Sequence, residues 1–201
     1  MLPCDRFSVE LSGKVQFVRH SQSFSLAVSG PPRLLALMRT LPHSRSCFVC
    51  GDSNPIGLKL RLQTDGRIVQ THVVPGSEFV GFKQTMHGGI VGTLLDEVMA
   101  WACAVQTKRF AYCAELTVRF LHPVRPGEEL TVTGEVVNDR RGRIFEAKSE
   151  LRDRAGKVLA SATGKYLPVK QADTTDMATD LVCPPDWEFG SEGILRSREG
   201  T

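Results

Sequence analysis

The sequence has a small net charge, no long run of apolar residues and no basic N-terminal segment of the kind that begins a secretory signal. The formal net charge of the 201 residues is +3, and the Lys and Arg residues are scattered, which argues against a nucleic-acid-binding protein. No run approaches the ~18 consecutive apolar residues of a membrane helix, so no membrane association is predicted. Asp5 and Glu10 stand where a secretory signal has basic residues, and secretion is therefore not expected.

Cysteine is also sparse, and two common motifs are missing. Six Cys in 201 residues is not a disulfide-dense composition, which predicts reduced thiols in a cytoplasmic protein. The chain contains no Gly-x-Ser-x-Gly elbow and no phosphate-binding loop, so the sequence does not support a serine-triad hydrolase or a P-loop enzyme. Nothing in the sequence indicates a cofactor.

A pair of cysteines, Cys47-x-x-Cys50, has the spacing of a zinc site. A structural zinc site needs four ligands, and no second Cys pair follows, although His43 and His72 are available. The favoured interpretation is a packed turn, and no metal is predicted.

Patterning divides the chain into three zones. Residues 1–42 show no sustained periodicity and are predicted to form a poorly structured extension. Residues 43–168 alternate regularly and form the predicted domain. Residues 169–201 carry three basic against seven acidic side chains, which predicts a solvated, flexible tail, with Trp187 and Phe189 available to dock it.

The pattern of residues 43–168 predicts two strands, one helix and four further strands, in that order. The residues His87–Gln106 are apolar at helical spacing and nearly apolar on every side, which predicts a buried helix. Short turn-like connections between the later strands predict antiparallel neighbours. We therefore expect an α+β fold in which an antiparallel sheet curls around one long central helix. The predicted strands are Leu58–Leu62, Arg67–Val74, Tyr112–Leu121, Leu130–Val137, Ile144–Leu151 and Val158–Leu167.

The predicted helix has a glycine-rich start, Met86-His87-Gly88-Gly89. Two glycines let a ligand approach the backbone closely, and the first turn of a helix presents unpaired N–H groups at its positive end. Such groups can stabilise a carbonyl oxygen that gains negative charge. The alternative is an ordinary glycine-rich loop in which His87 caps the helix.

Asp96 and Glu97 are the only charged residues between Ile90 and Gln106. A carboxylate in an apolar helix is costly unless it is paired, hydrated or protonated, and such groups gather at working sites. The alternative is that both point out of the core. They are about 100° apart on the helix and cannot share one small pocket equally. Gly88 lies eight residues before Asp96, a rise of ~12 Å, so the two can cooperate only if a symmetric dimer brings them together.

These motifs resemble the hotdog-fold thioesterase superfamily, and more closely its PaaI-like branch, which acts on acyl-coenzyme A thioesters. The likeness covers about residues 46–168. The segments that carry it are His87-Gly88-Gly89-Ile90, Leu95-Asp96, Cys47–Gly51 with Asn54-Pro55 and Gly57-Leu58, Ala114–Val124 and Gly156–Ala160.

The resemblance implies a hotdog fold that forms a homodimer, or a homotetramer of paired dimers, with its site at the dimer interface. Asp96 matches the carboxylate that acts as general base or nucleophile. Gly88 matches the glycine whose N–H polarises the thioester carbonyl, and His87 matches the histidine that shapes the loop. The acyl group is expected to run along the helix near Leu95 and Met99.

Two positions depart from the family pattern. Gly81 stands where some relatives have Asn, and Cys113 stands where relatives often have Ser or Thr to orient water or the carboxylate. Because a thiol is a weak hydrogen-bonding group, Gln84 or Thr117 is a possible substitute. The candidate substrate-binding residues are Gly89, Cys113, Gln84, Glu97, Arg140 and Arg141.

The two arginines belong to a predicted hairpin turn and could meet the phosphates of coenzyme A, although a solvated hairpin tip is the simpler interpretation. The predicted function is hydrolysis of acyl-coenzyme A thioesters. The alternative is a non-catalytic acyl-coenzyme A-binding module, which Gly81 and Cys113 favour. A hotdog dehydratase or hydratase is disfavoured because the chain lacks a His-Phe-Pro-Gly motif.

Overall fold

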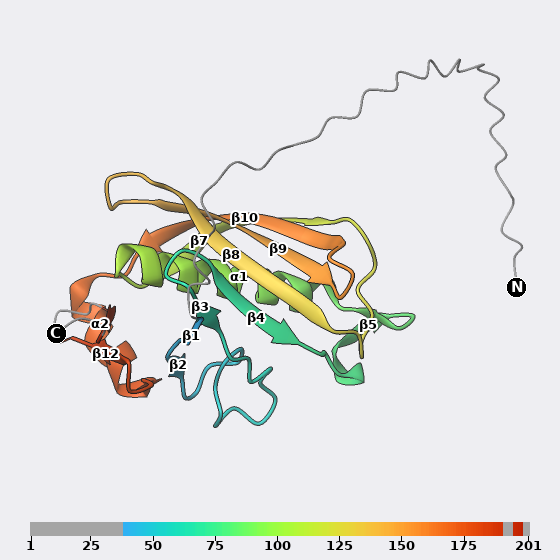
Figure 1. Ribbon diagram of the computed structural model, residues 1–201, viewed down its shortest axis with the longest axis horizontal. Coiled ribbons are helices and arrows are strands. Elements are labelled where there is room, and N and C mark those ends of the chain that lie inside the picture. The colour runs from blue at the N-terminus through green and yellow to red at the C-terminus, as the bar shows by residue number, and fades with distance from the viewer. Residues whose placement is uncertain (1–37, 191–194, 199–201) are drawn as a thin grey trace, which may run out of the picture. The chain divides into compact units, whose positions relative to one another are not determined.

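The computed structural model describes residues 38–190 and 195–198, all within the compact unit Ala36–Thr201 (Figure 1). Its main feature is a seven-stranded sheet with the strand order β1-β3-β4-β8-β9-β10-β7, in which every neighbouring pair is antiparallel. The strands are β1 (Arg39–Thr40), β3 (Gln63–Thr64), β4 (Val69–Val73), β7 (Ala111–Phe120), β8 (Leu130–Asp139), β9 (Phe145–Asp153) and β10 (Val158–Pro168).

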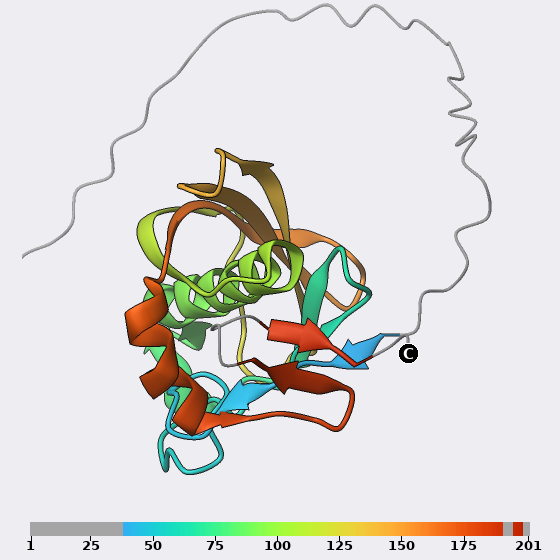
Figure 2. The ribbon, with the colours of Figure 1, turned by 90° about the vertical axis from the view of Figure 1, so that its left-hand side faces the viewer.

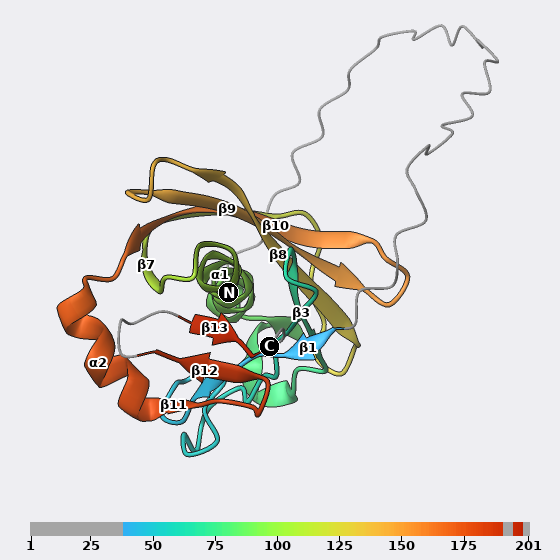
Figure 3. The same cartoon turned by 60° about the vertical axis from the view of Figure 1, so that its left-hand side comes forward.

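One long helix, α1 (Gly88–Thr107), lies inside the curl of this sheet, as a view almost along the helix axis shows (Figure 3). The helix contacts β4, β7, β8, β9 and β10. At Gly134 of β8 the strand backbone lies so close to the helix that a Cβ atom would stand 2.7 Å from the Val98 carbonyl oxygen. The predicted architecture, an antiparallel sheet around a buried central helix, is confirmed.

Shorter elements surround this body. A 3₁₀ turn, Ser77–Phe79, leads into the hairpin β5 (Val80–Phe82) and β6 (Thr85–Met86), which ends directly before α1. The remaining elements are β2 (His43–Ser44), α2 (Gln171–Asp180), β11 (Leu181–Val182), β12 (Trp187–Phe189) and β13 (Leu195–Ser197), with β2 paired to β11 and β12 paired to β13.

The four strands predicted after the helix form within one or two residues of their predicted bounds, because the alternation of apolar and polar residues marks the face that packs on α1. The strand predicted at Leu58–Leu62 is wrong. Leu60 and Leu62 are buried, but the amides of Leu58 and Leu60 donate to carbonyls of the loop at residues 48–49, and the strand pairing starts at Gln63.

The prediction that no segment is long and apolar enough for a membrane span needs correction. Helix α1 passes that test by length and composition, because aliphatic residues, alanine and cysteine dominate it and Asp96 and Glu97 are its only charged residues. Its most apolar window is 61% buried inside the protein, as expected for the central helix of a wrapped sheet.

The ends of the domain also differ from the prediction. Residues 38–42, assigned to the unstructured extension, include β1, which pairs with β3, and the fully buried Leu41. Residues 1–37 of that extension lie outside the described residues.

The described part of the C-terminal segment, predicted to be flexible, folds against the domain (Figure 2). Trp187 and Leu195 are buried in the core, the Phe189 ring packs on Phe110, and the Arg39 guanidinium lies 5.0 Å above the Trp187 ring. These few apolar side chains outweigh the acidic, glycine-rich composition around them, because each removes a large area from water.

Candidate active site

Asp96 stands on the half-buried side of α1 that faces strand β10. The Tyr166 hydroxyl, from the inner face of β10, donates a hydrogen bond to Asp96 Oδ1 at 2.7 Å. Tyr166 is fully buried, so its ring holds this hydroxyl in a fixed place. The carboxylate therefore has one partner from the sheet, as a carboxylate in an apolar helix requires.

A glycine makes room for the tyrosine. Gly164 precedes Tyr166 by two residues and shares its face of β10. A Cβ atom at Gly164 would lie 2.7 Å from Tyr166 Cε2 and 3.1 Å from the hydroxyl oxygen. Tyr166 was not among the residues predicted from the sequence. The available signal was this large polar-tipped side chain, which follows the small residues Ala160, Ala162 and Gly164 on one face of the strand.

A β-bulge brings Cys113 to the same place. Opposite β10, Glu115 pairs with Lys165 and Cys113 pairs with Tyr166, which leaves Ala114 as the extra residue of β7. Strict alternation would put Cys113 on the outer face with Glu115, and the bulge turns it to the inner face instead. There the Cys113 thiol lies near the Asp96 carboxylate and the Tyr166 hydroxyl, and it donates to the Glu115 carbonyl oxygen at 3.6 Å.

The environment favours the protonated form of both neighbours of Asp96. Burial and the adjacent negative charge of Asp96 raise the pKa of Tyr166 well above its ordinary value. The same two causes raise the pKa of the Cys113 thiol to about 11. At neutral pH the Tyr166 hydroxyl therefore donates to the carboxylate, and the Cys113 thiol nearby is protonated.

The start of α1 is a second polar feature. His87 caps the helix, and its ring Nδ1 accepts a hydrogen bond from the Gly89 amide at 3.0 Å. Among the described residues, the Gly88 N–H has no hydrogen-bond acceptor. The cap prediction for His87 is thus confirmed, and Gly88 presents a backbone donor at the positive end of the helix.

Gly88 also lines a cavity of about 350 Å³ whose wall is mostly apolar. The Phe120 ring lies against Gly88, where a Cβ atom would be 3.2 Å from the ring tip. Gly81, in strand β5, packs against His87. A Cβ atom at Gly81 would stand 2.9 Å from His87 Cα. The backbone as it stands therefore has no room for the Asn that some relatives carry at this position.

The structure does not gather the other predicted residues around Asp96. Gln84 lies at the exposed tip of the β5–β6 hairpin, where it and Lys83 both have positive φ. Arg140 and Arg141 are exposed at the β8–β9 turn, and Arg140 pairs with Glu146. Gly89 is exposed beside His87 at the helix start.

Four other residues that the sequence singled out are Thr117, Leu95, Met99 and Glu97. Thr117 cannot replace Cys113 within the chain, because its neighbour Val118 faces the helix and Thr117 points to the opposite side of β7. Leu95 and Met99, expected along the acyl group, are fully buried in the core. Glu97 points away from Asp96, as the 100° separation predicts, and the Trp101 indole donates to it.

Strand β7 forms an open edge of the sheet. Within residues 38–190 and 195–198 it pairs with β10 alone, and its inward-facing Leu116 and Phe120 are 37% and 57% exposed. Long, apolar edge strands are liable to pair with another chain. This edge begins beside the Gly88 cavity and reaches Cys113, so it connects the two halves of the candidate site.

Comparisons with known proteins agree with this architecture. Residues 83–160 match the family model described as the thioesterase superfamily. The solved structure of protein RHA08564, a thioesterase superfamily protein, is similar with a TM-score of 0.56 and 26% identity, over 61% of this chain and 60% of that one. The PaaI protein from the phenylacetic acid degradation operon of E. coli has the same fold, with a TM-score of 0.53 and 23% identity over 59% and 86% of the two chains.

The chain is also similar to a curated protein that is described as an esterase. The Caenorhabditis elegans protein "Putative esterase F42H10.6" is 36% identical over 85 residues, which are 42% of this chain and 49% of that protein. The chain thus matches about half the length of this relative. The predicted hotdog thioesterase fold is confirmed by these likenesses.

Proposed function

We propose that this chain, whose fold is that of the hotdog thioesterases and whose residues 83–160 match the thioesterase superfamily model, hydrolyses acyl-coenzyme A thioesters to a free acid and coenzyme A. The proposal depends on two groups of helix α1: the Asp96 carboxylate, which a hydrogen bond orients, and the Gly88 N–H, which is available to a ligand. Asp96 is held by Tyr166 in an apolar helix, and Gly88, at the start of that helix, lines a cavity and has no acceptor for its N–H among the described residues.

The two groups divide the reaction between them. The Gly88 N–H donates to the thioester carbonyl oxygen, which gains negative charge as the carbonyl carbon is attacked. Asp96 takes a proton from the attacking water, or attacks the carbon itself to form an anhydride that water then opens. The carbon–sulfur bond then breaks. In the first route the leaving sulfur takes the proton that Asp96 removed from water; in the second it leaves as a thiolate, and the water that opens the anhydride supplies the proton for the thiol of coenzyme A.

A dimer completes the site in this proposal. Gly88 and Asp96 are two helical turns apart, so one small thioester group cannot touch both groups of the same helix. The open edge of β7, with the exposed side chains of Leu116 and Phe120, offers a surface on which a second copy can pair. A two-fold axis at this edge would bring the Asp96 of one subunit toward the Gly88 of the other.

The proposal is tested by measuring hydrolysis of acyl-coenzyme A compounds of varied chain length and aromaticity. We expect turnover by the wild type and a loss of about 100-fold or more in kcat for Asp96→Asn, in the range found for removal of a general base. Asp173→Asn, which changes an exposed carboxylate on α2, is the matched control and should keep full activity. Equal rates for the wild type and Asp96→Asn would remove Asp96 from the reaction.

A second outcome corresponds to the binding module. Gly81 and Cys113 replace the polar residues that relatives use to orient water, and both positions lie beside proposed site residues. If a non-hydrolysable thioester analogue binds tightly while no acyl-coenzyme A is turned over, the site binds its ligand without catalysis.

A further inference from the structure

A second cluster of reactive side chains lies on the Glu97 side of α1. The Sγ atoms of Cys47 and Cys50 and a carboxylate oxygen of Glu97 all lie within 4.8 Å of one another. The two cysteines come from the loop after β2, and the glutamate comes from the middle of α1, almost 50 residues later. The proposed hydrolysis of thioesters uses none of these three groups.

Backbone hydrogen bonds of the loop at Cys47–Gly51 fix the position of the Cys47 sulfur. The Gly51 amide donates to the Cys47 carbonyl oxygen at 2.9 Å, which closes a tight turn over Cys47–Gly51. The Val49 amide donates to Cys47 Sγ at 3.2 Å. A Cβ atom at Gly51 would lie 2.4 Å from the Cys47 carbonyl oxygen, so only glycine allows the turn to close. Amide donors to a sulfur stabilise the thiolate, which is the form that binds metals.

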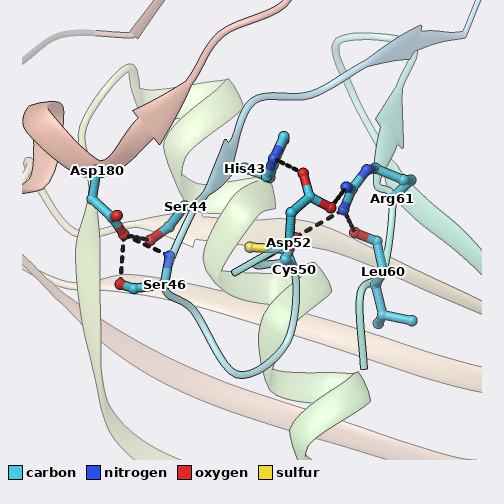
Figure 4. Close-up of polar contacts among 8 residues, drawn as sticks. All are labelled: His43, Ser44, Ser46, Cys50, Asp52, Leu60, Arg61 and Asp180. Atoms are coloured by element: carbon cyan, nitrogen blue, oxygen red, sulfur yellow. Dashed lines mark hydrogen bonds and ion pairs between the residues drawn. The ribbon is translucent and has the colours of Figure 1, made fainter. Parts of the chain in front are cut away.

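Charged groups hold the second cysteine's end of the loop (Figure 4). Asp52 accepts from His43 Nε2 at 2.9 Å and forms an ion pair with Arg61. Arg61 Nη1 in turn donates to the Cys50 carbonyl oxygen at 2.8 Å. The hydrogen bonds to Asp52 keep the pKa of its carboxyl below the ordinary range.

The C-terminal segment holds the other end. Asp180, the last residue of α2, accepts hydrogen bonds from the Ser46 hydroxyl at 2.7 Å and the Ser46 amide at 3.1 Å, and from the Ser44 hydroxyl (Figure 4). The Cys-x-x-Cys loop is thus fixed on both sides, which is what a preorganised ligand set requires.

The third group is oriented by its own helix. Trp101 Nε1, one turn after Glu97, donates to Glu97 Oε1 at 3.0 Å. This bond leaves the other carboxylate oxygen for a different partner and fixes the plane of the group. Hydrogen bonds of this kind to a ligating carboxylate are common around protein metal sites.

A cavity of about 450 Å³ adjoins the cluster, and its lining includes Cys47, Cys50 and Glu97. Aromatic and apolar side chains form much of the remaining wall, among them Trp101, Phe110 and Met177. A ligand held by the three groups would therefore have one side open to this space.

We propose that Cys47, Cys50 and Glu97 bind one Zn²⁺ ion, with a fourth coordination position that faces the cavity. Two cysteine sulfurs separated by two residues, together with one carboxylate oxygen, form a ligand set suited to zinc, whereas Mg²⁺ and Ca²⁺ require oxygen ligands. A divalent cation would offset the negative charges of the ionised forms of these three groups. Three protein ligands and one open position are typical of zinc sites that bind water or a small ligand.

The test uses the full-length protein, purified under reducing conditions, with zinc as the probe. After incubation with ZnSO₄ and desalting, mass spectrometry of the metal should find about one zinc per chain. Titration with Co²⁺ should give the intense charge-transfer absorption of thiolate–cobalt bonds. This absorption reports sulfur ligands in the wild type itself, so the result does not depend on any variant.

Variants then assign the ligands. Cys47→Ser, Cys50→Ser and Glu97→Gln should each weaken zinc binding by about 100-fold, and the two cysteine variants should also reduce the cobalt–thiolate absorption. Cys183→Ser and Glu129→Gln change exposed residues of the same types and should bind zinc as the wild type does. Circular dichroism checks that each variant is folded.

Three results would overturn the proposal. The first is wild-type protein that keeps no zinc and shows no thiolate–cobalt absorption. The second is unchanged affinity in both cysteine variants. The third is a Cys47–Cys50 disulfide that forms equally fast with and without zinc under mild oxidation, because this would assign the pair to redox chemistry.

Discussion

The Tyr166 hydroxyl lies 2.7 Å from Asp96 Oδ1 and joins the inner face of β10 to the central helix α1. The bond links two residues that are 70 positions apart in the sequence. It depends on a third residue, because the Tyr166 ring occupies space that exists only while position 164 has no side chain. This dependence can be measured.

We predict that Tyr166→Phe lowers kcat for thioester hydrolysis by about tenfold, because a hydrogen bond to a charged group contributes ~1.5–3 kcal/mol. Gly164→Ala should lower kcat by a similar factor, since its Cβ atom displaces the ring and moves the hydroxyl away from Asp96. The double variant should be no slower than Tyr166→Phe, because both changes remove the same bond.

Gly92→Ala is the control for this series, since a Cβ atom there meets its nearest neighbour at 3.9 Å. Its kcat should equal that of the wild type. Multiplicative losses in the double variant, close to 100-fold, would show that Gly164 acts by a route independent of the tyrosine.

The same pair predicts how stability depends on pH. Burial and the negative charge of Asp96 raise the pKa of Tyr166 in the folded protein above the value of about 10 in the unfolded chain. Above that pH the unfolded state releases this proton and the folded state keeps it. The contribution of Tyr166 is therefore fully present below pH 10 and is lost as the pH rises.

The measurement is urea unfolding of the wild type and Tyr166→Phe between pH 8 and pH 11. Above about pH 10, the free energy of unfolding should fall more steeply for the wild type, by up to ~1.4 kcal/mol per pH unit. Parallel curves for the two proteins would mean that Tyr166 ionises as easily in the folded state as in the unfolded chain.

Local sequence patterns were sufficient for most of the fold. The helical spacing of apolar residues predicted α1 within a residue, and two-residue alternation predicted β7 to β10, because both patterns record which side chains face one shared core. The strand at Leu58–Leu62 was predicted wrongly because Leu60 and Leu62 can be buried in the same way in a strand and in an extended loop. The two structures differ only in the hydrogen-bond partners of the backbone.

The contacts between distant segments could not be predicted in this way. Asp96 was identified from the sequence as a charged residue in an apolar helix. Nothing in the sequence around Tyr166 indicates that this tyrosine contacts the Asp96 carboxylate. Cys113 reaches the same carboxylate only because of the bulge at Ala114, which the alternation of β7 does not indicate. Glu97 stands beside Cys47 because the fold brings the two segments together.

The C-terminal segment provides a prediction about stability. Trp187 is 1% exposed and belongs to the core, although the segment around it is acidic and was expected to be solvated. Trp187→Ala should lower the free energy of unfolding by about 3–5 kcal/mol, in the range found for truncation of buried aromatic side chains. Urea unfolding followed by circular dichroism measures this change.

Ile56→Ala is the comparison, because Ile56 is 73% exposed and its truncation should change stability by less than about 0.5 kcal/mol. A Trp187→Ala variant as stable as Ile56→Ala would mean that the C-terminal segment does not dock on the domain in solution.

The Gly88 amide can be removed without disturbing the helix. Gly88 is the first residue of α1, where proline is well tolerated, and His87 before it is extended with ψ 131°, as the residue before a proline prefers. Gly88→Pro should therefore fold normally and lose about 10²–10³-fold in kcat, the effect of deleting one donor to a developing oxyanion. Gly88→Ala adds the same Cβ atom but keeps the N–H, and it should retain most of the activity.

The proposed dimeric site makes a stricter prediction. In mixed dimers of Gly88→Pro and Asp96→Asn chains, one of the two sites has an intact amide from one subunit and an intact carboxylate from the other. Random exchange of equal amounts should therefore restore about a quarter of the wild-type activity from two inactive proteins. If mass spectrometry shows that mixed dimers have formed and no activity returns, Gly88 and Asp96 do not act together across the interface.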